Sequence, residues 1–225
     1  MPETELHHTV RKPRLTFRIS HDSLSLSVAD PTLESQLHYE SYPVKNGISI
    51  AANLREAFKD NDLLQTGYDR AMVIIDTLNL LIPTEEFKKD EVEALYHYTF
   101  TGHENDVILT NVLPYLNCDV AFSINKDLKL VIDDHFSDIR FQPIMQSIWD
   151  HLHEASFTGM FKKLYGYFHD KKLEIIGYDK NRFKFYNTYQ IKHFKDAAYF
   201  LLYVWNQLEL DSQRDELHIV GDIPD

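Results

Sequence analysis

The chain repeats one pattern of secondary structure, once near each end of its 225 residues. In each copy, short segments in which apolar and polar residues alternate precede an amphipathic segment and then a continuous apolar run. The first copy runs from Leu15 to Asp76 and the second from Lys163 to Asp222. Alternation with period two predicts half-buried strands, and an unbroken apolar run predicts a strand covered on both faces. Each copy therefore predicts three hairpin-joined strands, a crossover helix and a buried fourth strand.

In the first copy, strands are predicted over 15–20 and 23–28, with a turn between them and a third strand before Pro43. A helix follows in which Ile50, Leu54 and Phe58 recur at helical spacing, and this stripe predicts packing on a sheet. The run 71–75 predicts the fourth strand.

In the second copy, strands are predicted over 164–168, 173–178, 183–189 and 217–220, with a helix over 194–208 before the last strand. This helix is apolar nearly all round, because it carries Tyr199, Phe200, Tyr203 and Trp205 besides its aliphatic residues. Two interpretations remain open. The helix is buried between a sheet and another helical layer, or one of its faces docks a partner.

Further strands and helices alternate between the copies. Helices are predicted after Pro83, with Thr84 as the N-cap, and over 127–135 and 144–154; strands are predicted over 107–113, 119–124 and 139–142. The small and polar stretch 155–159 predicts the domain boundary. We expect a flexible tail over 1–14, a first half with inserted α/β elements over 15–157, and a second half over 158–225.

Two β-β-β-α-β segments in tandem are typical of paired ribonuclease-H-like halves. The sequence therefore predicts the α/β class and an actin-like ATPase fold. Such a fold does not by itself specify an activity.

Charge and cysteine content narrow the function classes. The formal net charge of -12 repels phosphate backbones, so no nucleic-acid partner is predicted. The basic cluster of Arg11, Lys12 and Arg14 lies in the predicted tail and is expected to be solvated. A single cysteine, Cys118, fits a reducing compartment, and no apolar stretch is long enough to span a bilayer. We expect a cytoplasmic protein.

Several apolar motifs resemble those of a bacterial family of unknown function, domain family 3822. They are Ile74-Ile75-Asp76-Thr77, Leu81-Ile82-Pro83 with Phe87, and Ala121-Phe122-Ser123-Ile124. The resemblance covers most of the chain and implies an actin-like ATPase fold but no activity. It also implies a further helix after the last strand, so the second half is expected to be truncated at its C-terminus.

Actin-like ATPases hold nucleotide phosphates with two hairpin turns that carry Asp and Gly, because glycine lets backbone N–H groups approach phosphate oxygens. The matching turns here are Ser20-His21-Asp22-Ser23 and Phe168-His169-Asp170-Lys171, which contain Asp but no Gly. The adenosine-side segment offers one glycine, Gly221, where a pair is usual. Asp22, Asp170 and Gly221 are thus the candidate nucleotide-binding residues, and hairpin-turn aspartates are the structural alternative.

No catalytic or metal-ligating residue is predicted. A two-metal nuclease would need an acid on the first strand, and 15–20 contains none, which leaves Glu56 and Asp76 without their central partner. His151 and His153 are too closely spaced to share one helix face as zinc ligands.

Two functions from different classes follow. The first is a non-catalytic module for protein interaction or assembly, a pseudo-ATPase without a cofactor, which binds a protein partner or a second copy of itself. The alternative is a nucleotide-binding ATPase or phosphotransferase that uses the His-Asp turns to coordinate Mg-ATP.

Overall fold

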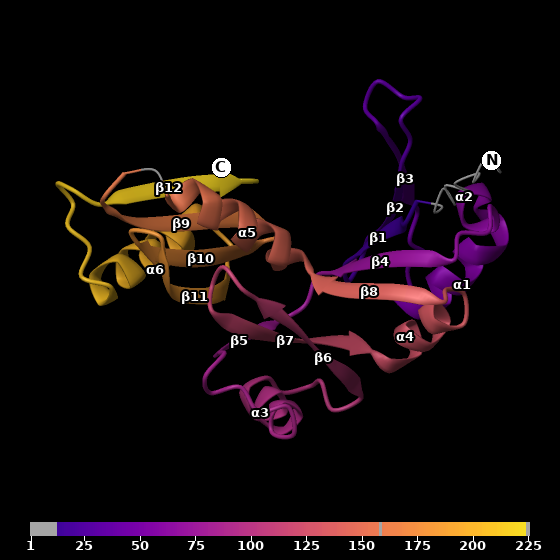
Figure 1. Ribbon diagram of the computed structural model, residues 1–225, viewed down its shortest axis with the longest axis horizontal. Coiled ribbons are helices and arrows are strands. Elements are labelled where there is room, and N and C mark those ends of the chain that lie inside the picture. Colours follow the sequence, from indigo (N-terminus) through magenta and orange to yellow (C-terminus); the bar gives the residue numbers. More distant parts are fainter. Residues whose placement is uncertain (1–12, 158, 224–225) are drawn as a thin grey trace, which may run out of the picture. The chain divides into compact units, whose positions relative to one another are not determined.

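A computed structural model describes residues 13–157 and 159–223. It is mixed α/β with several sheets (Figure 1). Two compact units account for the described chain: unit 1 contains 13–79, 93–109 and 122–144, and unit 2 contains 80–92, 110–121 and the described residues from 145 onward. None of the described helices is long and apolar enough to cross a membrane.

Unit 1 contains a five-stranded sheet in the order β3-β2-β1-β4-β8. Its strands are β1 (Leu15–Ile19), β2 (Leu24–Ala29), β3 (Leu37–Tyr42), β4 (Arg70–Ile75) and β8 (Asp138–Pro143). The β1, β2 and β3 strands pair antiparallel, whereas β4 pairs parallel to both β1 and β8. The helices of this unit include α1 (Ile50–Asp60), the short α2 (Asp62–Gln65) and α4 (Lys126–Asp133). Helix α1 packs against α4.

The core of unit 1 follows from the period-two pattern of its strands. Leu15, Phe17 and Ile19 point to one face of β1 and are buried, while the residues between them are more exposed. Leu54 of α1 and Ile132 of α4 belong to the same buried cluster. One apolar stripe from each helix therefore closes this face of the sheet.

Unit 2 contains a four-stranded sheet in the order β11-β10-β9-β12. Its strands are β9 (Lys162–His169), β10 (Lys172–Asp179), β11 (Arg182–Gln190) and β12 (Glu216–Gly221), with helices α5 (Ile144–Ser156) and α6 (Phe194–Gln207). Leu201 and Val204 of α6 pack on one face with Leu164 and Phe168. On the other face, the Trp149 ring of α5 meets the Tyr186 ring edge to face at 5.0 Å. In both large sheets, three antiparallel strands and a crossover helix thus precede a parallel strand.

A third sheet has the order β5-β7-β6, from β5 (Asn79–Pro83), β6 (Asp106–Leu113) and β7 (Cys118–Asn125). The helix expected directly after Pro83 does not begin there, because α3 spans Val92–Thr99. The Thr84 N–H donates to the Asn117 carbonyl at 3.1 Å, and the residues after it form turns. The apolar 79–83 segment is a strand, and this pairing holds Thr84 at the strand end instead of at a helix N-cap.

Arg14 also differs from the sequence-based expectation of a solvated tail residue. Its guanidinium donates to the carbonyls of Ala71 (2.7 Å) and Asp138 (3.0 Å) and to the Asp138 carboxylate (2.7 Å). Arg70 donates to the same carboxylate at 2.9 Å. Arg14 therefore bridges β4 and β8 at the start of their pairing. Arg11 and Lys12 lie outside the described residues.

We predict that Arg14→Met destabilises the protein in a pH-dependent way. Hydrogen bonds from Arg14 and Arg70 lower the pKa of Asp138. A lowered pKa in the folded state gives stability that is present above the unfolded-state pKa of about 3.9 and is lost as the pH falls through the folded-state value. Urea unfolding should show a difference between wild type and variant that is constant from about pH 8 to pH 5 and shrinks below about pH 4. A difference that does not change down to pH 3 would contradict this assignment.

Candidate functional site

The first predicted turn connects β1 to β2 and holds Asp22 at the surface. The Ser20 N–H donates to the Ser23 carbonyl at 2.9 Å, which closes the turn. The Ser20 hydroxyl shares a 2.6 Å hydrogen bond with the Ser23 hydroxyl and lies 3.3 Å from a carboxylate oxygen of Asp22. Asp22 thus has a structural role within its own turn, as is usual for aspartate in hairpins.

The second predicted turn is a two-residue hairpin between β9 and β10. Asp170 and Lys171 both have positive φ, 44° and 60°. Two such residues in succession give the type I′ geometry that suits the twist of paired strands, and glycine or asparagine usually occupies it. A lysine in this conformation is strained. The turn therefore has its shape without the glycine that close phosphate approach requires.

Behind this turn lies a chain of hydrogen-bonded polar groups. His169 Nε2 is 3.1 Å from a carboxylate oxygen of Glu174, and both side chains are buried. The other Glu174 oxygen accepts from the Thr188 hydroxyl at 2.6 Å, and the Thr188 hydroxyl lies 3.1 Å from that of Tyr186. The Tyr167 ring stacks on the His169 ring at 5.1 Å. The polar residues inside otherwise apolar strands were the only sign of this network in the sequence.

A small hollow of about 150 Å³ opens at the same turn. Its lining contains three cationic side chains and two carboxylates among the following residues: His169, Asp170, Lys171, Lys172, Ile191, Lys192 and Asp222. The structure therefore brings two of the three predicted site positions to one place within unit 2: Asp170 and the segment that contains Gly221. The hollow is smaller than the roughly 300 Å³ at which small-molecule pockets begin.

Gly221 has a structural reason to be glycine. Its φ is +92°, and a Cβ atom there would lie 2.1 Å from the Phe168 carbonyl oxygen. The next residue, Asp222, donates its N–H to that same oxygen at 2.9 Å. The close approach of β12 to β9 thus requires glycine whether or not a nucleotide binds.

Unit 1 contains a Ser-His-Asp cluster that the sequence did not indicate. His103 Nδ1 lies 2.8 Å from an Asp106 oxygen and 3.3 Å from the Ser123 hydroxyl. In a catalytic triad the acid and the nucleophile contact opposite ring nitrogens. Here both contact the same nitrogen, so the cluster has no proton path from the serine through the ring to the acid.

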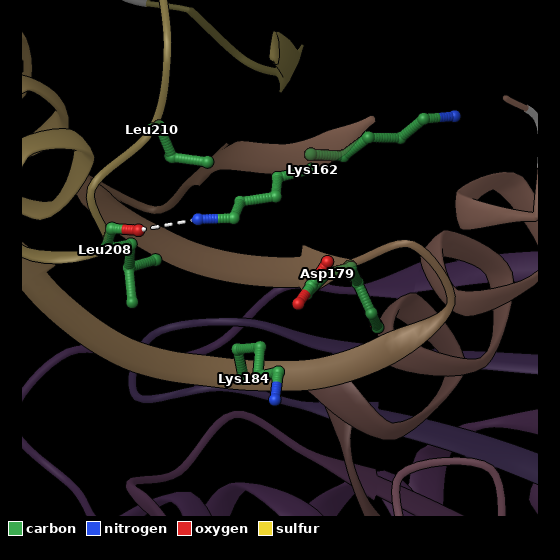
Figure 2. Close-up of a pocket in the computed structure, with 7 residues that line it drawn as sticks. Lys162, Asp179, Lys184, Leu208 and Leu210 are labelled. Atoms are coloured by element: carbon green, nitrogen blue, oxygen red, sulfur yellow. Dashed lines mark hydrogen bonds between the residues drawn. The ribbon is translucent and has the colours of Figure 1, made fainter. Parts of the chain in front are cut away.

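A second hollow, of about 210 Å³, lies at the C-terminal end of α6 (Figure 2). Lys162 extends across it and donates to the carbonyls of Leu208 (3.3 Å) and Glu209 (3.2 Å). A cation at this position complements the negative end of the helix dipole. The Lys162 ammonium therefore caps the helix, and Leu208 and Leu210 form the apolar part of the wall.

The outer face of α6 is apolar and exposed. Tyr199, Leu202 and Tyr203 are 64%, 63% and 49% exposed, and the rings of Tyr199 and Tyr203 lie nearly parallel at 6.3 Å. Ala197 and Leu201 on the inner face are buried against the sheet. The helix therefore has a buried stripe and an uncovered one, rather than burial on all sides.

The start of α6 is fixed by Asp196. Its carboxylate accepts the N–H groups of Lys192 and His193, both at 3.0 Å, and these hydrogen bonds lower the pKa of Asp196. Lys162 holds the other end of the helix. The exposed stripe is thus presented on a helix that is capped at both ends.

We predict that Gly221→Ala lowers the free energy of unfolding by at least about 2 kcal/mol, because the positive φ alone costs roughly 1–2 kcal/mol and the clash with Phe168 adds to it. Gly47→Ala is the matched control: its φ is +87° and its Cβ would meet no atom within 4 Å. It should cost only about 1 kcal/mol. Urea titrations of both variants measure the difference, and equal losses would show that close approach at Gly221 is unimportant.

Comparisons with known proteins agree with this fold. A crystal structure of a Bacteroides thetaiotaomicron protein with an actin-like ATPase fold and unknown function is 26% identical, with a TM-score of 0.84 over 99% of this chain and 87% of that one. The cytoplasmic domain of EpsL, from the type II secretion system of Vibrio cholerae, is 11% identical with a TM-score of 0.44 over 95% of this chain and 84% of that one, which supports no conclusion here. A search of curated proteins finds no matching sequence. The family described as "Protein of unknown function (DUF3822)" matches residues 3–225, so the chain belongs to that family.

Proposed function

We propose that this chain is a non-catalytic module for protein interaction or assembly. In this proposal two tandem ribonuclease-H-like halves, 15–157 and 158–225, form an actin-like scaffold, and the second half carries the binding surface. The exposed stripe of Tyr199, Leu202 and Tyr203 on α6 is the observation that carries the proposal. Scattered apolar residues are normal on a protein surface, whereas adjacent ones on one helix face are typical of an interface.

The chemistry of these side chains suits binding. Tyrosine offers a large apolar ring and a polar hydroxyl with few rotatable bonds, so ordering it at an interface costs little entropy. The stacking of Tyr199 on Tyr203 restricts both rings before any partner arrives. Each large apolar side chain removed from water contributes roughly 1.5–3 kcal/mol, so three of them are enough to anchor a contact.

We predict that Tyr199→Glu and Tyr203→Glu abolish partner binding and leave the protein folded. Both side chains are exposed, Tyr199 to 64% and Tyr203 to 49%, so a carboxylate there remains in water and does not disturb the core. Asn206→Glu is the control, because it adds the same charge to an exposed position of the same helix without removing an aromatic ring. Circular dichroism measures folding, and affinity capture from the organism's own lysate measures binding.

The proposal requires that proteins retained by wild type and by Asn206→Glu be lost from both tyrosine variants. If all four proteins retain the same partners, the α6 stripe is not the binding surface. If the tyrosine variants unfold, the stripe supports the fold and has no free face to offer.

The alternative function is nucleotide binding by an actin-like ATPase. The three lysines in the hollow at the β9–β10 turn favour it, because cationic side chains neutralise phosphate. The volume of that hollow and the Cβ atoms of Asp170 and Lys171 do not fit a nucleotide phosphate chain. We therefore derive no catalytic step from it.

We predict that Mg-ATP leaves the melting temperature unchanged and that ATP hydrolysis stays at background. A ligand at 100 times its Kd would add about 2.7 kcal/mol of stability, which a thermal unfolding assay detects readily. Stabilisation at micromolar Mg-ATP that disappears in Asp170→Asn or Asp22→Asn would replace our proposal with the enzymatic one.

A further inference from the structure

The hollow of about 210 Å³ at the C-terminal end of α6 combines charged groups with an apolar wall. It is lined by residues of β9, β10 and β11 and by Leu208 and Leu210, which follow the helix (Figure 2). Asp179 of β10 lies opposite Lys162 of β9 and Arg182 of β11 in the strand register. The hollow thus lies at one end of the four-stranded sheet, within unit 2.

A β-bulge and a glycine shape this end of the sheet. Between Gly177 and Tyr178 the register of β10 with β11 shifts, so that Lys184 has no partner residue on β10. Bulges of this kind redirect side chains and are common beside binding sites. A Cβ atom at Gly177 would lie 2.9 Å from the Leu208 side chain. Glycine therefore lets Leu208 pack closely on the sheet beside the bulge, where it forms part of the apolar wall.

Two ammonium groups border the hollow. The Lys162 ammonium donates to the carbonyls of Leu208 and Glu209 at 3.3 and 3.2 Å. An ammonium has three N–H groups, so one of them remains for a ligand. Lys184 is exposed, and its side chain has no hydrogen-bond or ion-pair partner among the residues that the structure describes.

The other charged groups of the lining leave these two cations available. Lys163 follows Lys162 on β9 and so points to the opposite face of the sheet, where its buried ammonium donates to the Ala155 carbonyl at 3.2 Å. Asp179 supplies the carboxylate of the lining, and no described residue binds its side chain. Asp215 lies nearby and accepts the Lys162 backbone N–H at 3.0 Å. The hollow therefore presents two cations and one carboxylate to a ligand.

The charges outside the lining do not change this balance. The β10–β11 turn and the segment 208–215 after α6 carry three cations and three carboxylates beyond the lining residues: Lys180, Arg182 and Arg214, with Glu209, Asp211 and Asp215. Their charges cancel. The excess positive charge at the hollow therefore comes from Lys162 and Lys184.

These groups match the last residue of a polypeptide. A terminal carboxylate would accept hydrogen bonds from the ammonium groups of Lys162 and Lys184, and such charge-assisted bonds are strong. The backbone N–H of the same residue would donate to Asp179. An apolar side chain would cover Leu208 and Leu210. Capture of a C-terminal carboxylate is a recurring mode of peptide recognition.

The size of the hollow also favours a chain end. Its volume of about 210 Å³ is below the roughly 300 Å³ of sites for drug-sized ligands, so a nucleotide or a long acyl chain does not fit. An inorganic anion would leave the two leucines uncovered. A single terminal residue can occupy the hollow while the rest of its chain stays outside.

We infer that the hollow beside the C-terminal end of α6 binds the C-terminal residue of a partner protein, and that this residue is apolar. The site is separate from the stripe of Tyr199, Leu202 and Tyr203 on the same helix. The inference therefore extends the proposed function to a second contact and can be tested without the stripe.

The test begins with random heptapeptides that are displayed at the free C-terminus of a phage coat protein and selected on the full chain. We expect the enriched peptides to end in an apolar residue. The best peptide is synthesised as the free acid and as the C-terminal amide, with a fluorescent label at its N-terminus. Fluorescence anisotropy measures both affinities. The amide lacks the negative charge, so it should bind at least about tenfold more weakly.

Lys184→Gln removes one ammonium from an exposed position without breaking a described contact. It should weaken binding of the free acid about tenfold and leave binding of the amide unchanged. Lys180→Gln is the matched control, because it removes the same charge from the exposed β10–β11 turn, outside the lining. Salt screens a charge that does not touch the ligand, so this control should change either affinity by less than about twofold.

Three outcomes overturn the inference: no enriched C-terminal sequence, equal affinities of acid and amide, or equal effects of the two lysine variants. Free leucine that displaces the peptide at the peptide's own concentration would make a free amino acid the ligand and reject the partner protein. Loss of peptide binding in Tyr199→Glu, with wild-type binding in Lys184→Gln, would retain the proposed function and reject this site. Binding that requires Lys184 and persists in Tyr199→Glu supports this site whether or not the α6 stripe has a partner.

Discussion

A strand that pairs in parallel with its neighbours is normally covered on both faces and paired on both sides, because its apolar side chains and backbone groups otherwise meet water. Unit 1 meets the pairing part of this requirement, because β4 lies between β1 and β8, and α1 and α4 cover one of its faces. Unit 2 meets it in part, since β12 has one neighbour and its Leu217 and Ile219 remain exposed. The binding function we propose uses the exposed stripe of Tyr199, Leu202 and Tyr203 on α6 in the same unit.

The polar residues in the β1–β2 and β9–β10 turns form hydrogen bonds that stabilise the turns themselves. Nucleotide binding would instead require them to contact phosphate. Asp22 accepts from Ser20 within its own turn, and the Asp170-Lys171 hairpin is anchored by the buried pair of His169 and Glu174. Gly221 is needed where β12 crosses close to Phe168. Each of these positions has a structural explanation that is independent of phosphate.

The sequence predicted family membership and the mixed α/β class because both depend on hydrophobic pattern. It failed where a local signal competed with pairing: Thr84 has the features of an N-cap, but its N–H pairs with Asn117, and α3 begins at Val92. Arg14 was assigned to a solvated tail because its partner, Asp138, is distant in sequence. The apolar excess of α6 was visible in the sequence, but which of its faces is exposed depends on the sheet beneath it. The His169–Glu174 pair was missed, although polar residues inside otherwise apolar strands were a signal for it.

The most direct test of this account is residue-resolved amide hydrogen exchange of the free protein, comparing β12 with β4. Ala71 and Val73 point their N–H groups to β8, and Leu217 and Ile219 occupy the matching positions at the open edge. The account predicts strong protection for Ala71 and Val73 and exchange close to unfolded rates for Leu217 and Ile219. Equal protection at the two pairs would show that the β12 edge is already covered, and it would contradict the account of β12 as an open edge.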